Sequence, residues 1–590
     1  MRLARSAVFA TSVILSSAVA MAQPAPPPAP PAPPEAPPAA APAAQPAQAA
    51  GAALPPPPPA SEPLRTDAPP PPPPPGSKAP APEPPAAAPK AFPMEPEVAA
   101  PAPSGPPLAG WHDGFFLRDS NDYFRLYPKG RLHLDFHSFF GPGLHGDNGV
   151  SASSGGNGVK NRFLVRRMRV ELAGEIMRRV QWIFQAEFGG MPISNANGRS
   201  QTSASSAGKE PSADSASWAA VQAPSASASI ANAYINYSVC PCLNLQVGQF
   251  NSPITLENRT STNSLSLVER SLPIRSFVVS SNKEIGAMVW GELGERNLMY
   301  EAGVFAGDGE SRAQIDNAVD VMGRVFARPF AKKGSKGLLD KAQIGVSARH
   351  GERDQMFVGY TYPSITTGQG VALWTPRYTD SQGRRTHIIP SGGQNLIGGE
   401  LRLPISFVDI RGEAYYVANS TREAIEGYQL TNTERLGRIT GIGWYVQLSA
   451  WPFGDAFVTG DPGFHRPTKI DLSKEPSKLK KGLEVVAIVA GVQADYNGAT
   501  RSESTHDENT PGGPGGVTSR ISVMQYGAVA TYWYTRYLRA SLSYNLYQTP
   551  GSGADKDNLA AVPGNSSKDQ ETKDTARTLH ELGGRFAVIF

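Results

Sequence analysis

Hydrophobic and polar residues alternate with a period of two from Gly130 to the end of the chain. The clearest segment is 537–547, with Leu, Ala and Tyr on one face and Arg, Ser and Asn on the other. In the segment 163–175, the predicted apolar face holds Leu164, Met168, Val170 and Leu172, opposite Arg167, Arg169, Glu171 and Glu175. This period is typical of strands with one apolar and one wet face.

The alternation predicts sixteen strands with lengths near the ~9–11 residues that a tilted strand needs to cross a bilayer. They are expected near 130–140, 162–175, 179–188, 230–238, 243–250, 284–292, 297–306, 319–329, 341–350, 394–403, 405–417, 439–451, 482–495, 520–534, 536–547 and 579–590. Residues Phe357 to Tyr362 are one further candidate strand that this assignment leaves unused.

Long and short connections alternate between these strands. Short turns are expected at 176–178, 239–242, 293–296, 404 and 535, with long gaps between them. Outer-membrane barrels have short periplasmic turns and long outer loops, whereas a soluble Greek key has no reason to alternate so strictly. Two supposed turns, 330–340 and 452–481, are too long, so either they carry insertions or they hide strands. The pattern predicts an all-β fold, a transmembrane antiparallel barrel.

The C-terminal strand is similar to the closing strand that outer-membrane assembly recognises. Leu582, Phe586, Val588 and the terminal Phe590 share one face. An even number of strands then places both ends of the barrel in the periplasm of a bacterium with an outer membrane. Aromatic residues near strand ends suit the girdles at the two membrane interfaces; they are Trp444, Trp451, Tyr532, Trp533 and Tyr534.

Two other segments precede the barrel, which is expected at 109–590. Residues 1–22 have the basic start, short apolar core and small-residue cleavage site of a signal peptide. Residues 23–108 hold 36 of the 57 prolines and are rich in alanine, which predicts a disordered, extended periplasmic segment. This segment is either a spacer or a tether to the cell wall or a periplasmic partner.

Composition excludes several classes of protein. A net charge of +4 is too small for a nucleic-acid binder, and two cysteines cannot build a disulfide scaffold or a multi-cysteine metal cluster. No catalytic motif appears, so we expect neither an enzyme nor a cofactor.

His133, Asp135 and His137 share a predicted face and form either a metal site or, as we favour, polar lumen. Cys240 and Cys242 lie in a short turn as free thiols or a local disulfide, which would be strained.

The polar faces of such a barrel line a water-filled lumen. Predicted inward arginines that line the pore and bind anions are Arg131, Arg167, Arg169, Arg324, Arg402, Arg411 and Arg539, with Arg328, Arg349 and Arg585 on the same grounds. Rows of arginine favour anions, but each arginine could instead pair with a neighbouring carboxylate and stiffen the wall. The third long loop is expected to fold inward as a constriction that carries Glu257, Arg259, Glu269, Arg270, Arg275 and Lys283.

Several motifs together resemble the phosphate-selective porin O and P family. They are Arg166 to Val170, Gly248-Gln249-Phe250 with Ser252-Pro253, Glu269-Arg270, Asn282 to Gly291, Gly303 to Gly309 and the final strand. The resemblance is best over 131–330 and leaves out the proline-rich segment. It implies a sixteen-stranded, usually trimeric outer-membrane porin through which small anions diffuse. Arg167, Arg169 and Arg270 are the matched basic residues, whereas the loop is poor in lysine and the lumen is rich in acids.

The sequence therefore predicts an outer-membrane porin that contacts membrane lipid and passes small solutes, such as phosphate, by passive diffusion. The alternative is a structural anchor, in which the barrel holds the outer membrane and the proline-rich segment joins it to the wall.

Overall fold

The computed structural model describes residues 107–140, 162–189, 229–277, 283–311, 314, 317–331, 337–353, 365–369, 372–374, 377–379, 385–425, 435–459, 463–464, 466–500, 516–548 and 578–590. The chain divides into two units, 1–97 and 98–590, and all described residues belong to the second. The predicted signal peptide, almost all of segment 23–108 and the unused candidate strand Phe357 to Tyr362 lie outside the described residues.

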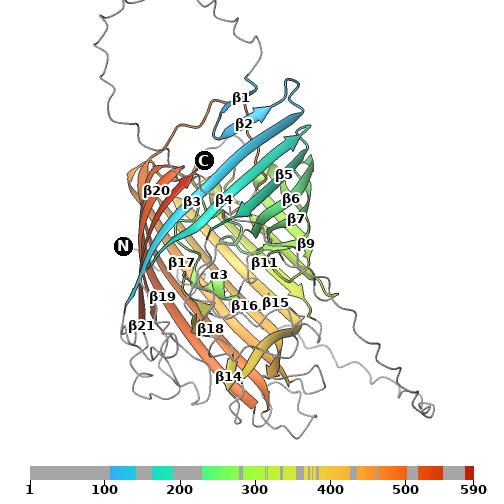
Figure 1. The fold of residues 1–590 in the computed structure, drawn as a ribbon, viewed down its shortest axis with the longest axis vertical. Helices are drawn as coiled ribbons and strands as arrows, with labels where there is room; N and C mark the ends of the chain where they lie inside the picture. Colours follow the sequence, from blue (N-terminus) through green and yellow to red (C-terminus); the bar gives the residue numbers. More distant parts are fainter. Residues whose placement is uncertain are drawn as a thin grey trace, which may run out of the picture. The chain divides into compact units, whose positions relative to one another are not determined.

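Sixteen antiparallel strands form one closed barrel (Figure 1), which confirms the predicted fold. Each strand pairs with its neighbours in the chain, β11 pairs with β15, and β21 closes the ring against β3. The strands are β3 (Phe124–Phe140), β4 (Arg162–Ile176), β5 (Val180–Glu187), β6 (Ser229–Cys240), β7 (Leu243–Asn251), β8 (Lys283–Leu293), β9 (Leu298–Phe305), β10 (Asp320–Ala327), β11 (Gln343–Gly351), β15 (Arg385–Ile405), β16 (Val408–Ile425), β17 (Arg435–Gly454), β18 (Gly482–Thr500), β19 (Gly516–Thr535), β20 (Leu538–Gln548) and β21 (Thr578–Ile589).

The wall of the barrel is uneven in height. Strands β5 to β11 have 8 to 12 residues, whereas β15 to β19 have 18 to 21. The extra residues extend these five strands at the end of the barrel that carries the long loops (Figure 1). Most of the predicted starts and ends were wrong here, although the start of β18 at Gly482 was predicted correctly. In β15, for example, the register shifts between Pro390 and Gln394, and the intervening glycines interrupt the alternation that prediction relies on.

The two ends of the barrel differ as predicted. At one end, which we call the turn end, neighbouring strands are joined by connections such as Ser406-Phe407, and here β3 begins and β21 ends. The opposite end, with the long connections, is the loop end. The connections 328–342 and 455–481 belong to the turn end and contain no strand among their described residues, so they are insertions. We call 455–481 the turn insertion.

The outer face of the wall is apolar and the inner face is polar. Val346, Ile397 and Leu542 are more than half exposed on the outside, whereas Asp409, Arg402 and other charged side chains are buried inside. This is the arrangement expected of a barrel in lipid. Among the described residues, no helix has the length and hydrophobicity needed to cross a membrane.

Two of the predicted girdle aromatics lie elsewhere. Trp451 and Trp533 are 5% and 1% exposed, and they pack together inside the barrel wall. The indole nitrogen of Trp533 donates to Glu484 at 3.0 Å. Tyr532 and Tyr534 remain exposed, as a girdle requires. Trp533 follows the normal alternation of the strand. It faces the interior because its neighbours Tyr532 and Tyr534 face outward.

A bulge in β4 reverses part of the predicted pattern. His133 pairs with Arg167 and Leu134 pairs with Val165, so Arg166 is an extra residue on β4. On the N-terminal side of Arg166 the alternation is shifted by one residue, so Val165 faces outward. The prediction that Leu164 shares the outer face with Met168 was therefore wrong, and two consecutive arginines are available to the interior.

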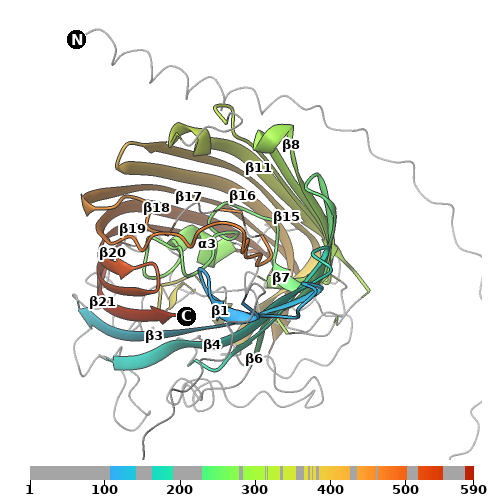
Figure 2. The same ribbon diagram turned by 90° about the horizontal axis from the view of Figure 1, so that it is seen from above.

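Several short elements lie inside or beside the barrel. β1 (Ala109–Trp111) and β2 (Phe115–Arg118) extend the sheet from the start of β3. The described part of the third long loop, 252–277, enters the ring and carries helix α3 (Leu272–Phe277), which Figure 2 shows within the ring. We call 252–277 the inward loop. β12 (Ile365–Thr366) and β13 (Ala372–Trp374) form a two-stranded sheet near α3, while β14 (Arg377–Thr379) pairs with β15.

Glycines on β17 make room for α3. A Cβ atom on Gly443 would lie 2.9 Å from the Cβ of Pro273 and 3.1 Å from the Cδ2 of Phe277. A Cβ atom on Gly441 would lie closer still to the ring of Phe277. The helix therefore packs directly against the backbone of the wall, as close approach over glycine permits.

Candidate channel interior

The inward loop is bonded to the barrel wall on several sides. The backbone nitrogen of Glu257 donates to Glu413 on β16 at 2.6 Å, and that of Leu272 donates to Gln525 on β19 at 2.9 Å. Arg259 pairs with Glu301 on β9. These strands surround the loop, so its inward position, predicted from loop order, agrees with the contacts.

Contacts within the loop hold its remaining charged residues. The Glu257 carboxylate accepts from the backbone nitrogen of Ser271 at 2.9 Å, and Arg270 donates to the carbonyls of Glu257 and Thr260. Arg275 donates from Nη1 to the Arg270 carbonyl at 2.7 Å. The last predicted loop residue, Lys283, is the first residue of β8 and lies 3.1 Å from Glu310.

On one side of the barrel, the predicted pore arginines are paired with carboxylates. Arg324 on β10 donates two hydrogen bonds of 2.8 Å to Glu400 and lies 3.4 Å from Glu301. Arg402 and Arg411 both bind Asp409, at 3.0 and 2.7 Å. These three side chains thus match the alternative in which arginines stiffen the wall.

Cations are in excess on the other side, where β20, β21, β3 and β4 adjoin. Besides Arg125 and Arg169, which pair with Asp122 and Glu187, the cationic side chains described there are Lys129, Arg131, Arg166, Arg167, Arg539 and Arg585. Among the described residues, five of these six pair with three carboxylates, Glu171, Asp135 and Glu269, and Arg539 makes no ion pair. We call these six residues the cationic wall. Arg169, on the same strand as Arg167, pairs separately with Glu187.

Glu269 joins the inward loop to the cationic wall. It lies 3.0 Å from Arg166, 2.6 Å from Arg585 and 3.6 Å from Arg167. Burial alone would raise the pKa of Glu269, but these guanidinium groups hold it well below its usual range. The carboxylate is therefore ionised at neutral pH, and one negative charge faces three positive ones.

Two members of the cationic wall bind the loop through uncharged groups. Arg539 donates to the carbonyls of Thr262, Asn263 and Leu265 at 3.2 to 3.3 Å. Arg131 donates to the hydroxyl of Thr262, and its carboxylate neighbour Glu171 is 3.9 Å away. Carbonyl and hydroxyl oxygens carry no full charge, so the negative charges that act on Arg539 are those of Glu484 and Asp135, with which it makes no ion pair.

Arg166 was not among the predicted inward residues, because alternation would have placed it on the outer face. A lipid-facing arginine would be costly, so its position between Val165 and Arg167 was the one available signal for a bulge.

The turn insertion was also missed as part of the interior. Gly463 in this insertion accepts a hydrogen bond from Arg324 at 2.7 Å, and a Cβ on it would lie 3.0 Å from Leu256 of the inward loop. Phe464 packs edge-on against Trp290 and Phe326. Two segments from opposite ends of the barrel therefore meet inside it.

Farther along the turn insertion, its described residues contact β3 and the connection between β1 and β2. Arg125 donates to the carbonyl of Ile470 at 2.7 Å, and Lys129 donates to Thr468 at 2.6 Å. Farther along, Ser477 donates from its backbone nitrogen and its hydroxyl to Asp113, which also lies 2.8 Å from Arg536. Residues 473–481 are exposed.

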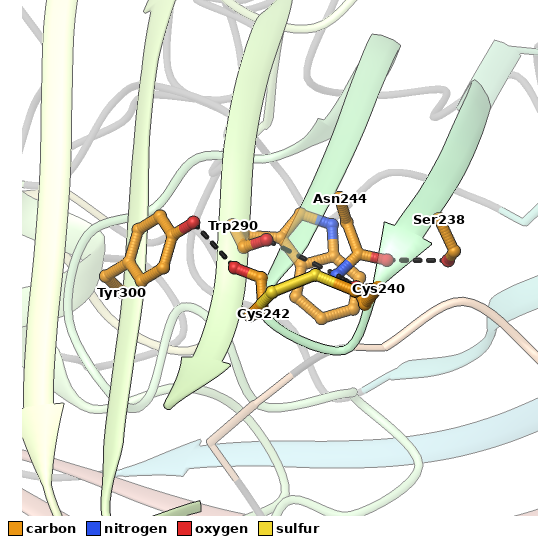
Figure 3. Close-up of a disulfide and its surroundings, with 6 residues drawn as sticks. All are labelled: Ser238, Cys240, Cys242, Asn244, Trp290 and Tyr300. Carbon is orange, nitrogen blue, oxygen red and sulfur yellow. Dashed lines mark hydrogen bonds between the residues drawn. A yellow bond between two sulfur atoms is a disulfide. The ribbon is translucent and has the colours of Figure 1, made fainter. Parts of the chain in front are cut away.

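The two cysteines form a disulfide across one residue, in the turn between β6 and β7 (Figure 3). The turn is bonded to its neighbours: Asn244 donates to the carbonyl of Cys240 at 3.4 Å, and Tyr300 donates to that of Cys242 at 2.8 Å. Gly291 on β8 lies against the Cys242 carbonyl, where a Cβ would collide with it. This explains why β8 has glycine at this position.

The histidines of the predicted polar cluster are buried inside the wall. His137 lies 3.3 Å from Asp135, whereas both ring nitrogens of His133 lack a hydrogen-bond partner. Within the described residues, no group of three or more His, Cys, Asp or Glu side chains could hold a metal ion.

A closed sixteen-stranded barrel with an apolar exterior and a charged interior defines the chain as a channel protein of the outer-membrane type. Residues 140–369 match the family model of the phosphate-selective porins O and P, which confirms the resemblance noted in the sequence. No curated protein matches the chain.

Several solved structures are similar to the chain at low identity. OmpT of Vibrio cholerae is 8% identical, with 80% of this chain and 100% of that chain covered and a TM-score of 0.39. In-vitro folded OmpT of Vibrio cholerae, in its trimer form, is 9% identical, with 79% and 100% covered and a TM-score of 0.38. An anion-selective porin from Comamonas acidovorans is 8% identical, with 79% and 100% covered and a TM-score of 0.37.

Proposed function

We propose that the chain is a passive outer-membrane porin for small anions, with its turn end and both barrel termini in the periplasm. The observation that carries the proposal is the cationic wall, in which five of the six cations share three carboxylates and Arg539 makes no ion pair with any described residue. A region of net positive charge, held in a partly dehydrated interior, attracts anions and repels cations. Phosphate suits this wall because a guanidinium binds its oxygens in pairs.

The pore-lining role of Arg131, Arg167, Arg169 and Arg539 rests on their place on or beside this wall. The inward loop would form the narrowest part of the route, because its Glu269 lies 3.6 Å from Arg167 and its Thr262 accepts hydrogen bonds from Arg131 and Arg539. A homotrimer is expected from the family resemblance.

Reversal potentials in planar bilayers test the proposal. Under a gradient of potassium chloride, and then of potassium phosphate, the purified protein should prefer the anion. Arg539→Gln should reduce that preference, while Arg539→Lys, which keeps the charge, should preserve most of it. Cation preference in the wild-type protein, or equal effects of the two substitutions, would contradict the proposal.

A second role, as an anchor for the proline-rich segment, is supported by the first described residues. β1 and β2 pair onto β3, and Asp113 is bonded to Ser477 and Arg536, so a force applied to the preceding segment would reach the barrel. Deleting 23–108 tests this role. A fragile cell envelope with unchanged conductance would support it, and an intact envelope would remove it.

A further inference from the structure

Apolar side chains cover one face of the hairpin that β1 and β2 form ahead of the barrel. Trp111, Phe115 and Leu117 are 44 to 48% exposed, and the register brings them together on this face because Trp111 pairs with Phe115. Between them, Phe116 points the opposite way and is buried. A contiguous apolar surface of this kind marks a contact with a protein or a membrane. We call it the bare face.

The opposite face of the hairpin packs against the turn insertion. Phe116 belongs to the same buried apolar cluster as Ile470, and a Cβ atom on Gly114 would lie 3.7 Å from the Cδ1 of Ile470. Asp113, in the connection between β1 and β2, accepts hydrogen bonds from Ser477. The hairpin is therefore held from the interior side, and its bare face points away from the channel.

The pairing of β2 with β3 shows which surface the bare face continues. Leu117 lies directly opposite Leu126, and the side chains of directly paired residues project from the same face of a sheet. The neighbours of Leu126 on β3, Arg125 and Tyr127, are buried on the inner face. Leu126 and Leu117 therefore belong to the outer face of the wall, and so does the rest of the bare face.

The hairpin fills a step in the wall at the turn end. β3 begins at Phe124 but meets the end of β21 only at Gly130, which exchanges two hydrogen bonds with Phe590. β2 pairs with residues of β3 that this leaves open (Figure 1). On the far side of β3, Ile176 and Met177 are exposed at the same level, since Phe124 pairs with Ile176. The bare face is thus level with the apolar exterior of the barrel.

Two further rings give this region the composition of a membrane interface. Tyr537, in the turn between β19 and β20, packs edge-on against Trp111 with ring centroids 5.2 Å apart. Tyr123, between the hairpin and β3, is 61% exposed. Tryptophan and tyrosine collect at the headgroup level of a bilayer, because one side chain combines an apolar ring with a polar group. The chemistry of the bare face therefore matches a phospholipid interface.

We propose that the hairpin is a membrane anchor, whose bare face lies in the interface of the phospholipid leaflet at the turn end. Trp111, Phe115 and Leu117 would reach between the headgroups and the first acyl carbons. A load on the chain before Ala109 would then be shared between the bilayer and the barrel. The inference rests on the proposed function in one respect, because it needs a barrel whose exterior faces lipid.

Nitroxide spin labels on single introduced cysteines test which medium covers the bare face. The two native cysteines are joined in a disulfide, so the label reacts with the introduced residue alone. In vesicles of phosphatidylethanolamine and phosphatidylglycerol, oxygen relaxes a label in lipid more strongly, whereas a nickel chelate relaxes a label in water. For Leu117→Cys, the ratio of the oxygen effect to the nickel effect should be severalfold higher than for a label in water.

Two matched variants calibrate this ratio. Leu542→Cys, on the outer face of β20, is the lipid reference, and Lys478→Cys, on the exposed part of the turn insertion, is the water reference. Heat-sensitive gel mobility checks that each labelled barrel is folded. We expect the ratio at Leu117 to lie closer to that at Leu542 than to that at Lys478.

The emission of Trp111 gives a second measurement, which needs no label. Subtracting the spectrum of Trp111→Phe from that of the wild-type protein isolates this residue among the 8 tryptophans. Lipids brominated on acyl carbons near the headgroup should quench the difference emission more strongly than water-soluble iodide does. Stronger quenching by iodide would contradict the anchor.

Two outcomes of the label experiment would overturn the anchor. One is a label at Leu117 that behaves like the label at Lys478 while the label at Leu542 reports lipid. The other is dipolar broadening between labels at Leu117, which would mean that a second copy of the chain covers this face. A label at Leu542 that reports water would instead contradict the proposed function, and the anchor would fall with it.

Discussion

Two segments occupy the interior of the barrel, and they are held in different ways. The inward loop is buried, and charged or hydrogen-bonded contacts link it to strands around the ring. The turn insertion is bonded through its own backbone carbonyls, small hydroxyls and one ion pair, Arg466 with Glu292. Its Ile470 packs in the core, and its last part is exposed. The difference indicates that the loop is a fixed part of the barrel, whereas the exposed last part of the insertion can be displaced from it.

Removing the charge of Glu269 should have the largest effect on the fixed segment. Glu269→Gln leaves Arg166, Arg167 and Arg585 with less negative charge, and loss of one partner from a buried ion pair costs about 3–5 kcal/mol. We expect a clear fall in the urea midpoint of the barrel in lipid vesicles, together with stronger anion preference. Glu475→Gln, on the exposed part of the turn insertion, is the control and should change neither.

Crowding α3 should have the next largest effect. In Gly443→Val the new side chain would meet Pro273 and Phe277, and overpacking of this kind costs about 1–3 kcal/mol. The same urea measurement applies. Gly399→Val is the matched control, because the Cβ of Gly399 would meet nothing closer than 3.9 Å. Equal midpoints for the two variants would mean that α3 is not packed as described.

Shortening the turn insertion should leave the stability of the barrel almost unchanged. Replacing 464–478 by a short Gly-Ser turn removes contacts but none between barrel strands. The residues that lose a contact are Trp290, Phe326, Glu292, Arg125, Lys129 and Asp113. The expected result is a severalfold higher single-channel conductance with the anion preference retained. An unchanged conductance would show that the insertion does not restrict the route. A large fall in the urea midpoint would show that the insertion, like the inward loop, is a fixed part of the barrel.

The smallest expected effect comes from the hydrogen bonds that Ser477 of the turn insertion donates to Asp113. Partial burial opposes ionisation of Asp113, but hydrogen bonds from Ser477 and the charge of Arg536 outweigh it and lower the pKa of this carboxyl. Its contribution is therefore complete above the ordinary aspartate range, near pH ~4, and is lost as the pH falls below it. An exposed contact of this type is worth at most about 1 kcal/mol.

Asp113→Asn reproduces this loss at constant pH. We expect faster tryptic cleavage after Lys474, Lys478 and Lys480 at pH 8, with no change in the urea midpoint. Cleavage at the wild-type rate would mean that Asp113 does not hold the insertion.

The strand pattern could be predicted from the sequence because lipid on one side and polar interior on the other impose a strict period of two. All sixteen strands were found in this way. Their ends were predicted less well where glycine and proline interrupt the period, as between Pro390 and Gln394 in β15. The bulge at Arg166 breaks the same rule, since a local extra residue changes which neighbours face inward.

The candidate site was predictable only in part. Alternation correctly placed Arg131, Arg324 and Arg539 inside, and loop order indicated the inward loop. Which arginines are paired depends on contacts between residues far apart in the chain, such as Arg585 with Asp135, and no local pattern encodes those. The turn insertion was noticed only as an irregular length, because its glycine and carbonyl contacts have no sequence signature.

The uneven wall has a consequence for the shape of the rim. β15 to β19 exceed β5 to β11 by about ten residues, and at ~3.3 Å per residue this makes one side of the rim taller by roughly 30 Å measured along the strands. The described part of the rim at the loop end is therefore oblique, with its low side over β5 to β11 and its high side over β15 to β19.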